Sequence, residues 1–583
     1  MSDERTIPSN KPKSVCTFTI LSDGNQVPGT YHVISIIVNK EVNRIPSATI
    51  LILDGDAAKE TFEVSNAADF EPGKKIEIKA GWVSDEETIF KGIVIKQNIK
   101  VKNNNSILMV ECRDESMKMT LVPKSKYYKD KKDSEIFEEI IGTYSGLSKD
   151  VEATTLQHKE VVQYNSTDWD FMVCRADVNG KLVIVDDGKI SIAKPNVSAA
   201  AELTAQYGST VLDLDAEIDA RLQLPGVKAA SWNFTDQQLL DTVDAAEPSV
   251  PAAGNLSSDQ LKKASSSDPL VLIHSGKITE AELQQWANAR LQKNRLAKIR
   301  GRVKVEGFAK MKPGKILQLN GVGARFEGKV FVTGIRHQIE HGNWTTHMQF
   351  GTNPEWFAET YTVQQPLAGA MLPPIQGLQI GIVTKLEEDP DGEDRIMVRL
   401  PVVHKNDEGI WCRVASLDAG KERGFFFRPE LEDEVIVGFI DDDPRHAVVL
   451  GMLNSSKLPA HTKPKDTNHI KGYVSREKMK WMFDDEKKII SIETPGGNKI
   501  VISEEDKGMS FIDQNGNKIV MNDQGIKIES IKDFTLKAAK DMKAEGLNTE
   551  VKASAQMKMK GDASAEFSSG GNTNLKGAIV NIN

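Results

Sequence analysis

The residues of this sequence best suited to metal chemistry are three histidines, His337, His341 and His347. Two histidines four positions apart on a helix would present both imidazoles to one zinc ion. Here the flanking residues alternate between apolar and polar types around Gly342-Asn343, which is a β pattern. The four-residue spacing of His337 and His341 therefore does not bring the two imidazoles together, and we expect no metal site.

Two other motifs suggest chemistry and are better explained as turns. Asp441-Asp442-Asp443-Pro444 offers three carboxylates, but calcium loops space their ligands along the chain, and this run lies between two predicted strands. Gly321-Val322-Gly323 lacks the third glycine of a dinucleotide-binding loop. Neither an HExxH nor a GxSxG motif is present. We expect no catalytic residue, no cofactor and no enzymatic activity.

The composition is that of a globular protein of several domains. The chain has 583 residues, of which 39% are hydrophobic and 27% charged, and its formal net charge is -9. That balance does not favour a nucleic-acid partner, which requires a basic surface. No apolar run is long enough for a bilayer, and the start of the chain lacks the apolar core of a signal peptide. The cysteines are far apart and are expected to be buried cytosolic thiols: Cys16, Cys112, Cys174 and Cys412.

The strongest structural pattern is a strict alternation over residues 551–567. Lysine and other polar residues fill one parity, which predicts a strand with one dry face. Helix-forming residue types are common here, but at helical spacing Val551, Ala555, Lys558 and Asp562 would share a face, so no apolar stripe would form. The dry parity consists of Val551, Ala553, Ala555, Met557, Met559, Gly561, Ala563, Ala565 and Phe567.

This strand is too long to stand alone. At about 3.3 Å per residue it would span more than about 50 Å, and no amphipathic helix follows to cover it. The same alternation begins earlier, at Ile490 and Ile492 and then at Ile500 and Ile502, and it recurs through Leu536. An open sheet with such a face would aggregate. We therefore predict a β-helical shaft in which several copies of the chain hide each other's inner face, and the small residues near its end suggest a taper.

The rest of the chain divides into recognisable segments. Short alternating runs over residues 15–113 predict antiparallel strands. Helices are expected after Ser134 as N-cap, over residues 167–178 and over residues 279–299, with a hairpin around Asn179-Gly180. Five further strand candidates are typical of an OB-type barrel: Leu378–Leu386, Arg395–Leu400, Trp411–Ala415, Glu434–Ile440 and His446–Met452.

One internal repeat links the two ends of the first segment. Pro72-Gly73 precedes an alternating run and a later Gly-Ile pair, and Pro313-Gly314 does the same at almost equal spacing. Such hairpins are common in β proteins, so chance is one explanation. The other is that the chain contains two similar small barrels, of which three chains would present six. The predicted domains are a hub over residues 1–365, an OB-fold domain over 375–455, a linker over 456–480 and a shaft over 481–583.

Three groups of residues carry a resemblance to a known family. Residues 395–401, 409–414 and 427–437 look like an OB barrel, residues 481–498 like a barrel-to-spike junction, and Pro313-Gly314 like the end of a hub. In this order they resemble VgrG, the spike family of bacterial type VI secretion systems, and the hub and spike of contractile phage tails. The resemblance implies a mainly β fold with an α+β hub of two barrels, an OB barrel and an intertwined trimeric β-helix. The shaft departs from the family in lacking dense valine-glycine repeats.

The resemblance also implies the partners. Three chains would form a hub on a tube of hexameric Hcp rings and meet baseplate components, and a PAAR-repeat protein would cap the spike. Contraction would drive the assembly from the cytoplasm through a target membrane, carrying effectors or their chaperones, without a signal peptide. A phage tail or an extracellular contractile injection particle is the alternative. An enzyme carried on the spike is less favoured, because only residues 455–480 separate barrel from shaft and no domain follows Asn583.

The last residues are expected to be a docking platform. A β-helix that stops exposes unpaired backbone groups and an apolar cross-section, which a cap would cover. A frayed tail is the alternative. Because the last histidine is His469, we expect no metal held by side chains at the tip. The residues expected to meet the PAAR-type cap are Ile579, Val580, Asn581, Ile582 and Asn583.

Overall fold

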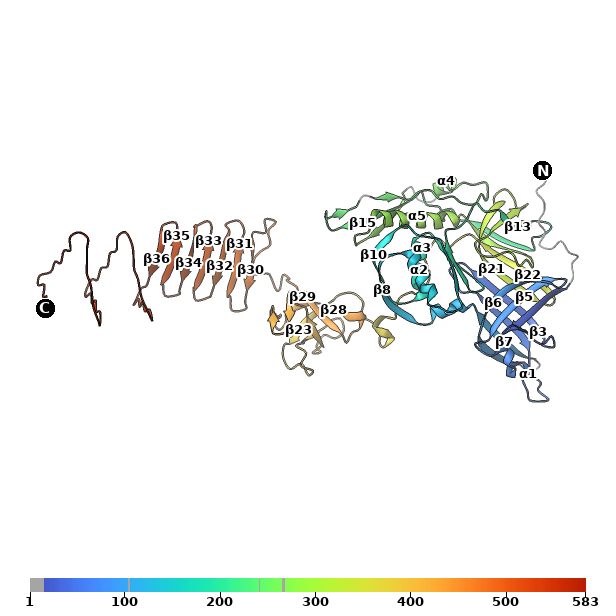
Figure 1. The fold of residues 1–583 in the computed structure, drawn as a ribbon, viewed down its shortest axis with the longest axis horizontal. Coiled ribbons are helices and arrows are strands. Elements are labelled where there is room, and N and C mark those ends of the chain that lie inside the picture. The colour runs from blue at the N-terminus through green and yellow to red at the C-terminus, as the bar shows by residue number, and fades with distance from the viewer. Residues whose placement is uncertain (1–14, 103–104, 241, 265–267, 583) are drawn as a thin grey trace. The chain divides into compact units, whose positions relative to one another are not determined.

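The computed structural model describes residues 15–102, 105–240, 242–264 and 268–582. The chain forms two compact units that meet in sequence at the Pro374-Ile375 bond (Figure 1). Both are built mainly from strands, with few helices, so the predicted fold class is confirmed. Within the described ranges no helix combines the length and the apolar character needed to cross a bilayer.

The first unit is organised by one 13-stranded sheet. Its path runs β14-β19-β22-β21-β3-β4-β7-β6-β5-β1-β2, and β20 and β13 branch from β21. The early strands are β1 (Cys16–Ser22), β2 (Asn25–Gln26), β3 (Val33–Glu41), β4 (Ser47–Leu53), β5 (Lys75–Trp82), β6 (Asp85–Lys102) and β7 (Asn105–Arg113). The late strands are β13 (Ala201–Gln206), β14 (Asp213–Ile218), β19 (Ile299–Glu306), β20 (Ile316–Asn320), β21 (Gly328–Glu340) and β22 (Asn343–Phe350).

The two halves of this sheet repeat one corner. The Gly73 amide donates to the Val94 carbonyl at 2.8 Å, and the Val94 amide donates back to the lysine after Gly73 at 2.9 Å. The same two bonds recur at Gly314: its amide donates to the Val332 carbonyl at 2.8 Å, and the Val332 amide donates back to the carbonyl of Lys315 at 2.9 Å. A bulge follows both valines, and both glycines have positive φ, 103° and 88°. Shared bonds and bulges favour a true repeat over two unrelated Pro-Gly hairpins.

The two expected hub barrels are thus two halves of one sheet. Strand β3 pairs with β21 from Glu41↔Gly334 to Ser35↔Glu340 and joins the halves edge to edge. Each half keeps its own buried cluster, one around Ile50 and Phe90 and the other around Val303 and Leu317. The repeat therefore has separate cores but no free edge between them.

A mixed α/β region lies between the two halves in sequence. Its first part contains β8 (Pro123–Lys132), α2 (Asp133–Gly142), β9 (Ser148–Val151), β10 (Gln157–Thr167), α3 (Asp168–Val178), β11 (Leu182–Asp186) and β12 (Lys189–Ala193). Its second part contains β15 (Val227–Asn233), β16 (Gln238–Leu239), β17 (Val243–Asp244), β18 (Leu270–His274) and α5 (Glu280–Leu296). The remaining α-helices are one-turn elements, α1 (Glu63–Asn66), α4 (Ser258–Leu261) and α6 (Phe357–Thr360).

Two of the three expected helices begin where the sequence places them. Thr167 and Thr279 are the N-caps of α3 and α5, each accepting a hydrogen bond from the backbone amide three residues later. Ser134 is not the N-cap of α2, because it lies inside the helix. Its hydroxyl accepts a hydrogen bond from the Thr154 amide at 3.1 Å. Lys132 takes that position instead.

The hairpin expected around Asn179-Gly180 is wrong. Asn179 is the C-cap of α3, and its side-chain amide donates to the Arg175 carbonyl at 2.8 Å, which ties it to the helix. The hairpin that does form joins β11 to β12 and turns at Asp187-Gly188.

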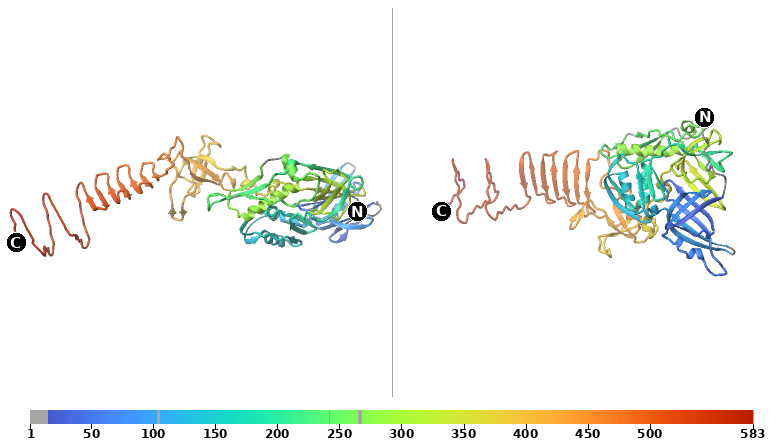
Figure 2. Two further views of the ribbon diagram at one scale, coloured as in Figure 1. Left: turned by 90° about the horizontal axis from the view of Figure 1, so that it is seen from above. Right: turned by 45° about the vertical axis from the view of Figure 1, so that its right-hand side comes forward.

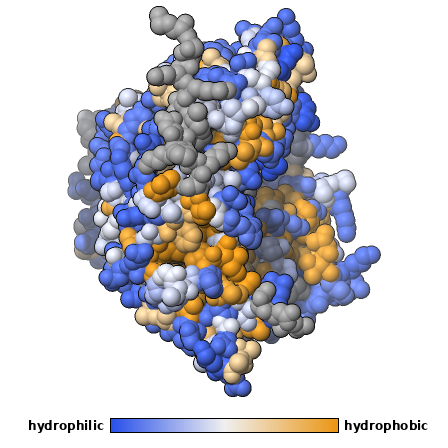
Figure 3. Space-filling model, turned by 90° about the vertical axis from the view of Figure 1, so that its right-hand side faces the viewer, coloured by the Kyte–Doolittle hydropathy of each residue, from blue (hydrophilic) through white to orange (hydrophobic). Residues whose placement is uncertain are grey.

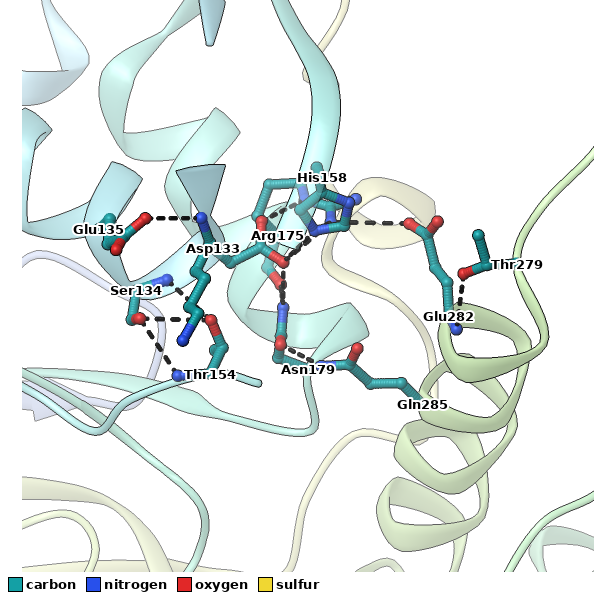
Figure 4. A network of polar contacts seen from close by, with 11 residues as sticks. Asp133, Ser134, Glu135, Thr154, His158, Arg175, Asn179, Thr279, Glu282 and Gln285 are labelled. Carbon is teal, nitrogen blue, oxygen red and sulfur yellow. Dashed lines mark hydrogen bonds and ion pairs between the residues drawn. The ribbon is translucent and has the colours of Figure 1, made fainter. Parts of the chain in front are cut away.

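A buried polar network holds this α/β region together (Figure 4). The Asp133 carboxylate, 1% exposed, accepts from Arg175 Nε at 2.8 Å and from Asn179 Nδ2 at 2.9 Å. His158 Nε2 lies 3.0 Å from the same carboxylate, and Arg175 also reaches Glu282 of α5 at 3.7 Å. Burial alone would raise the pKa of Asp133, but the bonds from His158 and Arg175 outweigh it and hold that pKa well below its usual value.

The second unit begins with a closed barrel. Its strands β23 (Gln379–Lys385), β24 (Ile396–Arg399), β25 (Ile410–Val414), β28 (Glu434–Phe439) and β29 (Ala447–Met452) close in the order β23-β24-β25-β29-β28. All five predicted strands are present. Val383, Val398 and Val435 alternate inward to form the core. A small hairpin, β26 (Ala419–Gly420) and β27 (Arg423–Gly424), lies outside the barrel.

A seven-stranded meander follows the barrel (Figure 2). It contains β30 (Ile470–Val474), β31 (Lys480–Asp484), β32 (Ile489–Glu493), β33 (Lys499–Ser503), β34 (Gly508–Ile512), β35 (Lys518–Asn522) and β36 (Gly525–Glu529). Every neighbouring pair is antiparallel, so we call this the shaft sheet. It starts inside the predicted linker, because Tyr473 of β30 pairs with Trp481 of β31.

Beyond Glu529 the chain bends at regular intervals without forming strands. No described residue from 530 to 582 belongs to a helix or strand. Bends recur at residues 531–532, 539–540, 547–548, 554–555, 562–563, 570–571 and 578–579, so the spacing is eight residues with one step of seven. The strand expected over residues 551–567 does not form in the single chain, because two bends interrupt it and one chain supplies no neighbouring strand for hydrogen bonding.

We predict that Asp133→Asn lowers the free energy of unfolding of the first unit by about 3–5 kcal/mol at pH 7, the cost of breaking a buried ion pair. Because the folded pKa lies below the unfolded value of about 3.9, the stabilisation is present above that pH and is lost as the pH falls. The difference in urea unfolding between wild type and variant should therefore shrink steadily as the pH falls below about 4. Asp150→Asn, at a side chain 62% exposed, is the control and should change little. Equal losses in both variants would contradict the role of the network.

Candidate interface on the shaft

Two rows of apolar side chains cross the same face of the shaft sheet. The register places them opposite one another from strand to strand, as in Ile492↔Ile500 and Ile490↔Ile502. The first row contains Tyr473, Trp481, Ile492, Ile500, Phe511, Ile519 and Ile528. The second row contains Phe483, Ile490, Ile502, Met509, Met521 and Ile526. We call these thirteen residues the apolar ladder.

The apolar ladder is open to solvent in the single chain. Exposed fractions run from 37% at Met509 to 72% at Ile526, and only Phe483 and Met521 are half-buried. An open hollow of about 540 Å³ on this face is lined by Ile500, Phe511 and other members of the ladder. Burying one such side chain is worth about 1.5–3 kcal/mol, so this face has a large free energy to gain from a partner. Uncovered faces of this size mark interaction surfaces.

The opposite face of the shaft sheet is more polar than the ladder, although Met482, Val501 and Val520 also lie on it. Lys480 pairs with Glu493 across β31 and β32 at 3.7 Å, and Lys518 pairs with Glu529 across β35 and β36 at 2.6 Å. Ser491 and Ser510 lie between these charged edges. One side of the sheet is therefore almost entirely apolar, and the other mixes charged, polar and apolar residues.

Two equivalent turns set the spacing of the hairpins. In the turns that end at Asn498 and Asn517, Gly497 and Gly516 adopt positive φ, 95° and 98°. The Asn498 side chain accepts from the backbone amide of Gln514 in the next turn at 3.1 Å. Asn517 accepts in the same way from the amide of residue 531 at 3.0 Å. Each asparagine thus fixes one hairpin against the next and keeps the ladder in register.

The structure brings together only some of the predicted interior residues. Ile490, Ile492, Ile500 and Ile502 are neighbours in the ladder. The distal residues lie beyond the sheet, on segments separated by bends, and Ala555 and Ala563 lie in the bends. All of these distal residues are exposed: Val551, Ala553, Ala555, Met557, Met559, Ala563, Ala565 and Phe567.

The sequence reasoning missed the aromatic members of the ladder. Tyr473, Trp481 and Phe483 begin its two rows, but Tyr473 was assigned to the linker and the other two to the junction. Trp481 and Phe483 are two residues apart, so they lie on the same face of a strand. This alternation is the sequence signal that indicates their place in the ladder.

The predicted tip lies at the end of the described chain. Ile579 is 81% exposed and Ile582 84%, and Val580 and Asn581 are also exposed. Asn583 lies outside the described residues.

The residues examined for metal chemistry have structural roles. His337 is 1% exposed, its Nδ1 lies 3.0 Å from Thr346 Oγ1, and burial lowers the pKa of its imidazole to about 3. Asp443 is held by Arg445 at 2.6 Å. Among the described residues, no group of three or more histidine, cysteine or acidic side chains is arranged to hold a metal ion. Three of the cysteines are buried and Cys174 is half-buried.

Comparison with known proteins agrees with this architecture. Residues 379–453 match the family model of the type VI secretion system/phage-baseplate injector OB domain. This match confirms the resemblance, expected from the sequence, to VgrG and phage tail proteins. The protein is thus a mainly β chain with an injector-type OB barrel and a shaft sheet. It belongs to the family of the Alg8 N-terminal domain, whose model matches residues 12–341, more than half of the chain. A search of curated proteins finds no match.

Three solved structures are similar in part. A tail protein from Neisseria meningitidis is 13% identical, covers 59% of this chain and 98% of its own, and has a TM-score of 0.44. A type VI secretion component of E. coli, described as similar to T4 bacteriophage tail proteins, is 13% identical with coverages of 74% and 99% and a TM-score of 0.39. A chain of the Francisella PdpA-VgrG complex is 11% identical with coverages of 88% and 80% and a TM-score of 0.38.

We predict that Ile502→Asp abolishes association of the chain, because each copy would bring a carboxylate into the dry interior at a cost of several kcal/mol. Light scattering should then report a monomer, while circular dichroism keeps the signal of the barrel and the hub.

Ser510→Asp, on the opposite face of the next strand, is the matched control and should leave the assembled mass unchanged. If Ile502→Asp assembles as well as the control, the apolar ladder is not the interface.

Proposed function

We propose that the chain is the homotrimeric spike of a type VI secretion system, which punctures a membrane and delivers effectors when a sheath contracts. The single observation that carries this proposal is the apolar ladder, followed by a chain that bends about every eight residues. A sheet with one bare apolar face and a segment without intrachain partners both require other copies of the same chain. The number three comes from the resemblance to VgrG.

The bends give the shared shaft a simple construction. Between bends the chain runs straight for about six residues, which is about 20 Å of extended backbone. A run of that length, followed by a turn, can form one side of a prism, and equivalent runs of the other copies can pair above and below it. Backbone groups that have no partner in one chain would then be satisfied between chains.

The hub is proposed to dock on the tube. The repeated corner at Gly73 and Gly314 gives each chain two similar sheet halves, so three chains would present six to a hexameric Hcp ring and to baseplate components. The end of the first unit at which β5, β13 and β22 lie shows apolar residues gathered among hydrophilic ones (Figure 3). Such a mixed surface suits an interface between proteins that assemble and separate.

The tip is proposed to bind a PAAR-type cap. Ile579, Val580, Asn581 and Ile582 are exposed at the end of the bent segment, where a shared shaft would present them three times. In this proposal the spike assembles in the cytoplasm and is ejected with effectors or their chaperones. It acts mechanically, and no step requires catalysis.

A spike of a phage tail or of an extracellular contractile injection particle is the second candidate. The description of the matched OB domain includes phage baseplates as well as type VI secretion, which favours keeping it. The neighbouring genes distinguish these two candidate functions. Sheath, tube and PAAR genes together with genes for a membrane complex indicate a secretion system. A capsid gene set would indicate a phage.

We predict that the purified wild-type protein scatters light with three times the mass of one chain at micromolar concentration. A monomer with native circular dichroism would contradict the spike, and a dimer would contradict the threefold shaft.

We further predict that a tagged PAAR-repeat protein from the same gene cluster co-purifies with the wild-type trimer and not with an Ile579→Asp/Ile582→Asp variant. Lys576→Glu changes a charge close to the tip but outside the apolar end, and it serves as the control that should still bind. If the PAAR-repeat protein fails to co-purify with both variants, or co-purifies with both, the proposed docking residues are contradicted.

A further inference from the structure

The α/β region of the first unit is a stack of four layers (Figure 1). Val227 of β15 and Leu283 of α5 belong to one buried cluster, so α5 covers one side of the sheet formed by β15 and β18. Lys293 of α5 pairs with Asp177 of α3 at 2.7 Å. The ring of Tyr128 in β8 stacks on the ring of Phe171 in α3, with the two centroids 5.8 Å apart. The order is therefore sheet, α5, α3 and the β8–β10 ribbon.

The outer side of the sheet carries exposed apolar residues beside one charged residue, Lys228, which lies directly opposite Val271. Because side chains alternate along a strand, the residues between those that face α5 point away from it. Trp232 is 39% exposed, its cross-strand partner Leu239 52%, Val271 43% and Ile273 63%. We call these four residues the sheet face.

The outer side of the ribbon also carries exposed apolar residues, beside the exposed cross-strand pair Lys129 and Glu160. Tyr128 is buried against the helices, so its neighbour Tyr127 points outward and is 68% exposed. Val162, directly opposite Tyr127 on β10, is 49% exposed, and Tyr164 is 69% exposed. We call Tyr127, Val162 and Tyr164 the ribbon face.

We propose that in the assembled protein the sheet face of one copy packs against the ribbon face of the next copy. Copies arranged around a threefold axis meet through two different surfaces of each chain, whereas a twofold dimer uses one surface twice. The α/β region carries two different faces with exposed apolar residues, and both include aromatic residues of the kind that anchor protein interfaces. The inference rests on the proposed trimer and names the surfaces through which the hubs close into a ring.

Hydroxyl-radical footprinting tests the inference on the full-length protein. Tyr127 and Tyr164 should be oxidised about fivefold or more slowly in the wild-type trimer than in the monomeric Ile502→Asp variant, because packing excludes water. Trp232 should be protected in parallel. Tyr207 is 67% exposed and lies on neither face, so it is the matched control and should react equally in both samples.

A second variant tests whether the two faces cover each other. Ile273→Asp alters only the sheet face, yet it should raise the oxidation of Tyr127 and Tyr164, which belong to the ribbon face, while light scattering still reports a trimer held by the shaft. Unchanged protection of the tyrosines in that trimer would overturn the pairing. Slow oxidation already in the monomeric variant would also overturn it, because the chain's own second unit would then cover the face. A wild-type protein that is not a trimer would fail the proposed function itself.

Discussion

The structure depends on an interaction that one chain cannot make alone. The apolar ladder leaves thirteen large side chains on an open face. The described residues beyond Glu529 bend at regular intervals and form no strand. Both features lower the free energy of the single chain only when other copies supply apolar contacts and backbone partners. The side chains of Asn498 and Asn517 each accept a hydrogen bond from the next turn or segment, which supports the register of the ladder. Assembly can then proceed from the sheet towards the tip.

The hub solves a similar problem within one chain. Its two similar halves would each end in a free strand edge, and the pairing of β3 with β21 removes both edges at once. The Asp133 network then fixes the α/β region that carries the sheet face and the ribbon face. In the proposed assembly, the sheet face, the ribbon face and the apolar ladder would all lie at contacts between copies.

Much of this architecture could be read from the sequence, because its signals are local. Alternation predicted all five barrel strands and the four isoleucines of the ladder, and threonine N-caps placed the starts of α3 and α5. The hairpin at Asn179-Gly180 was wrong because a tertiary contact with Asp133 turned a common turn pair into a helix cap. The bends in residues 551–567 were missed because alternation reports which side a residue faces and says nothing of where the chain turns. The β3–β21 pairing joins residues about 300 apart, which no local pattern reveals.

Hydrogen–deuterium exchange over residues 530–582 tests most directly whether this segment is completed by other copies. In the wild-type assembly these amides should exchange about a hundredfold or more slowly than in the Ile502→Asp monomer, because strands of neighbouring copies would bond them. In the monomer they should exchange at nearly the rate of an unstructured peptide. Equal and fast exchange in both proteins would mean that the segment has no partner chains, and the shared shaft would be refuted.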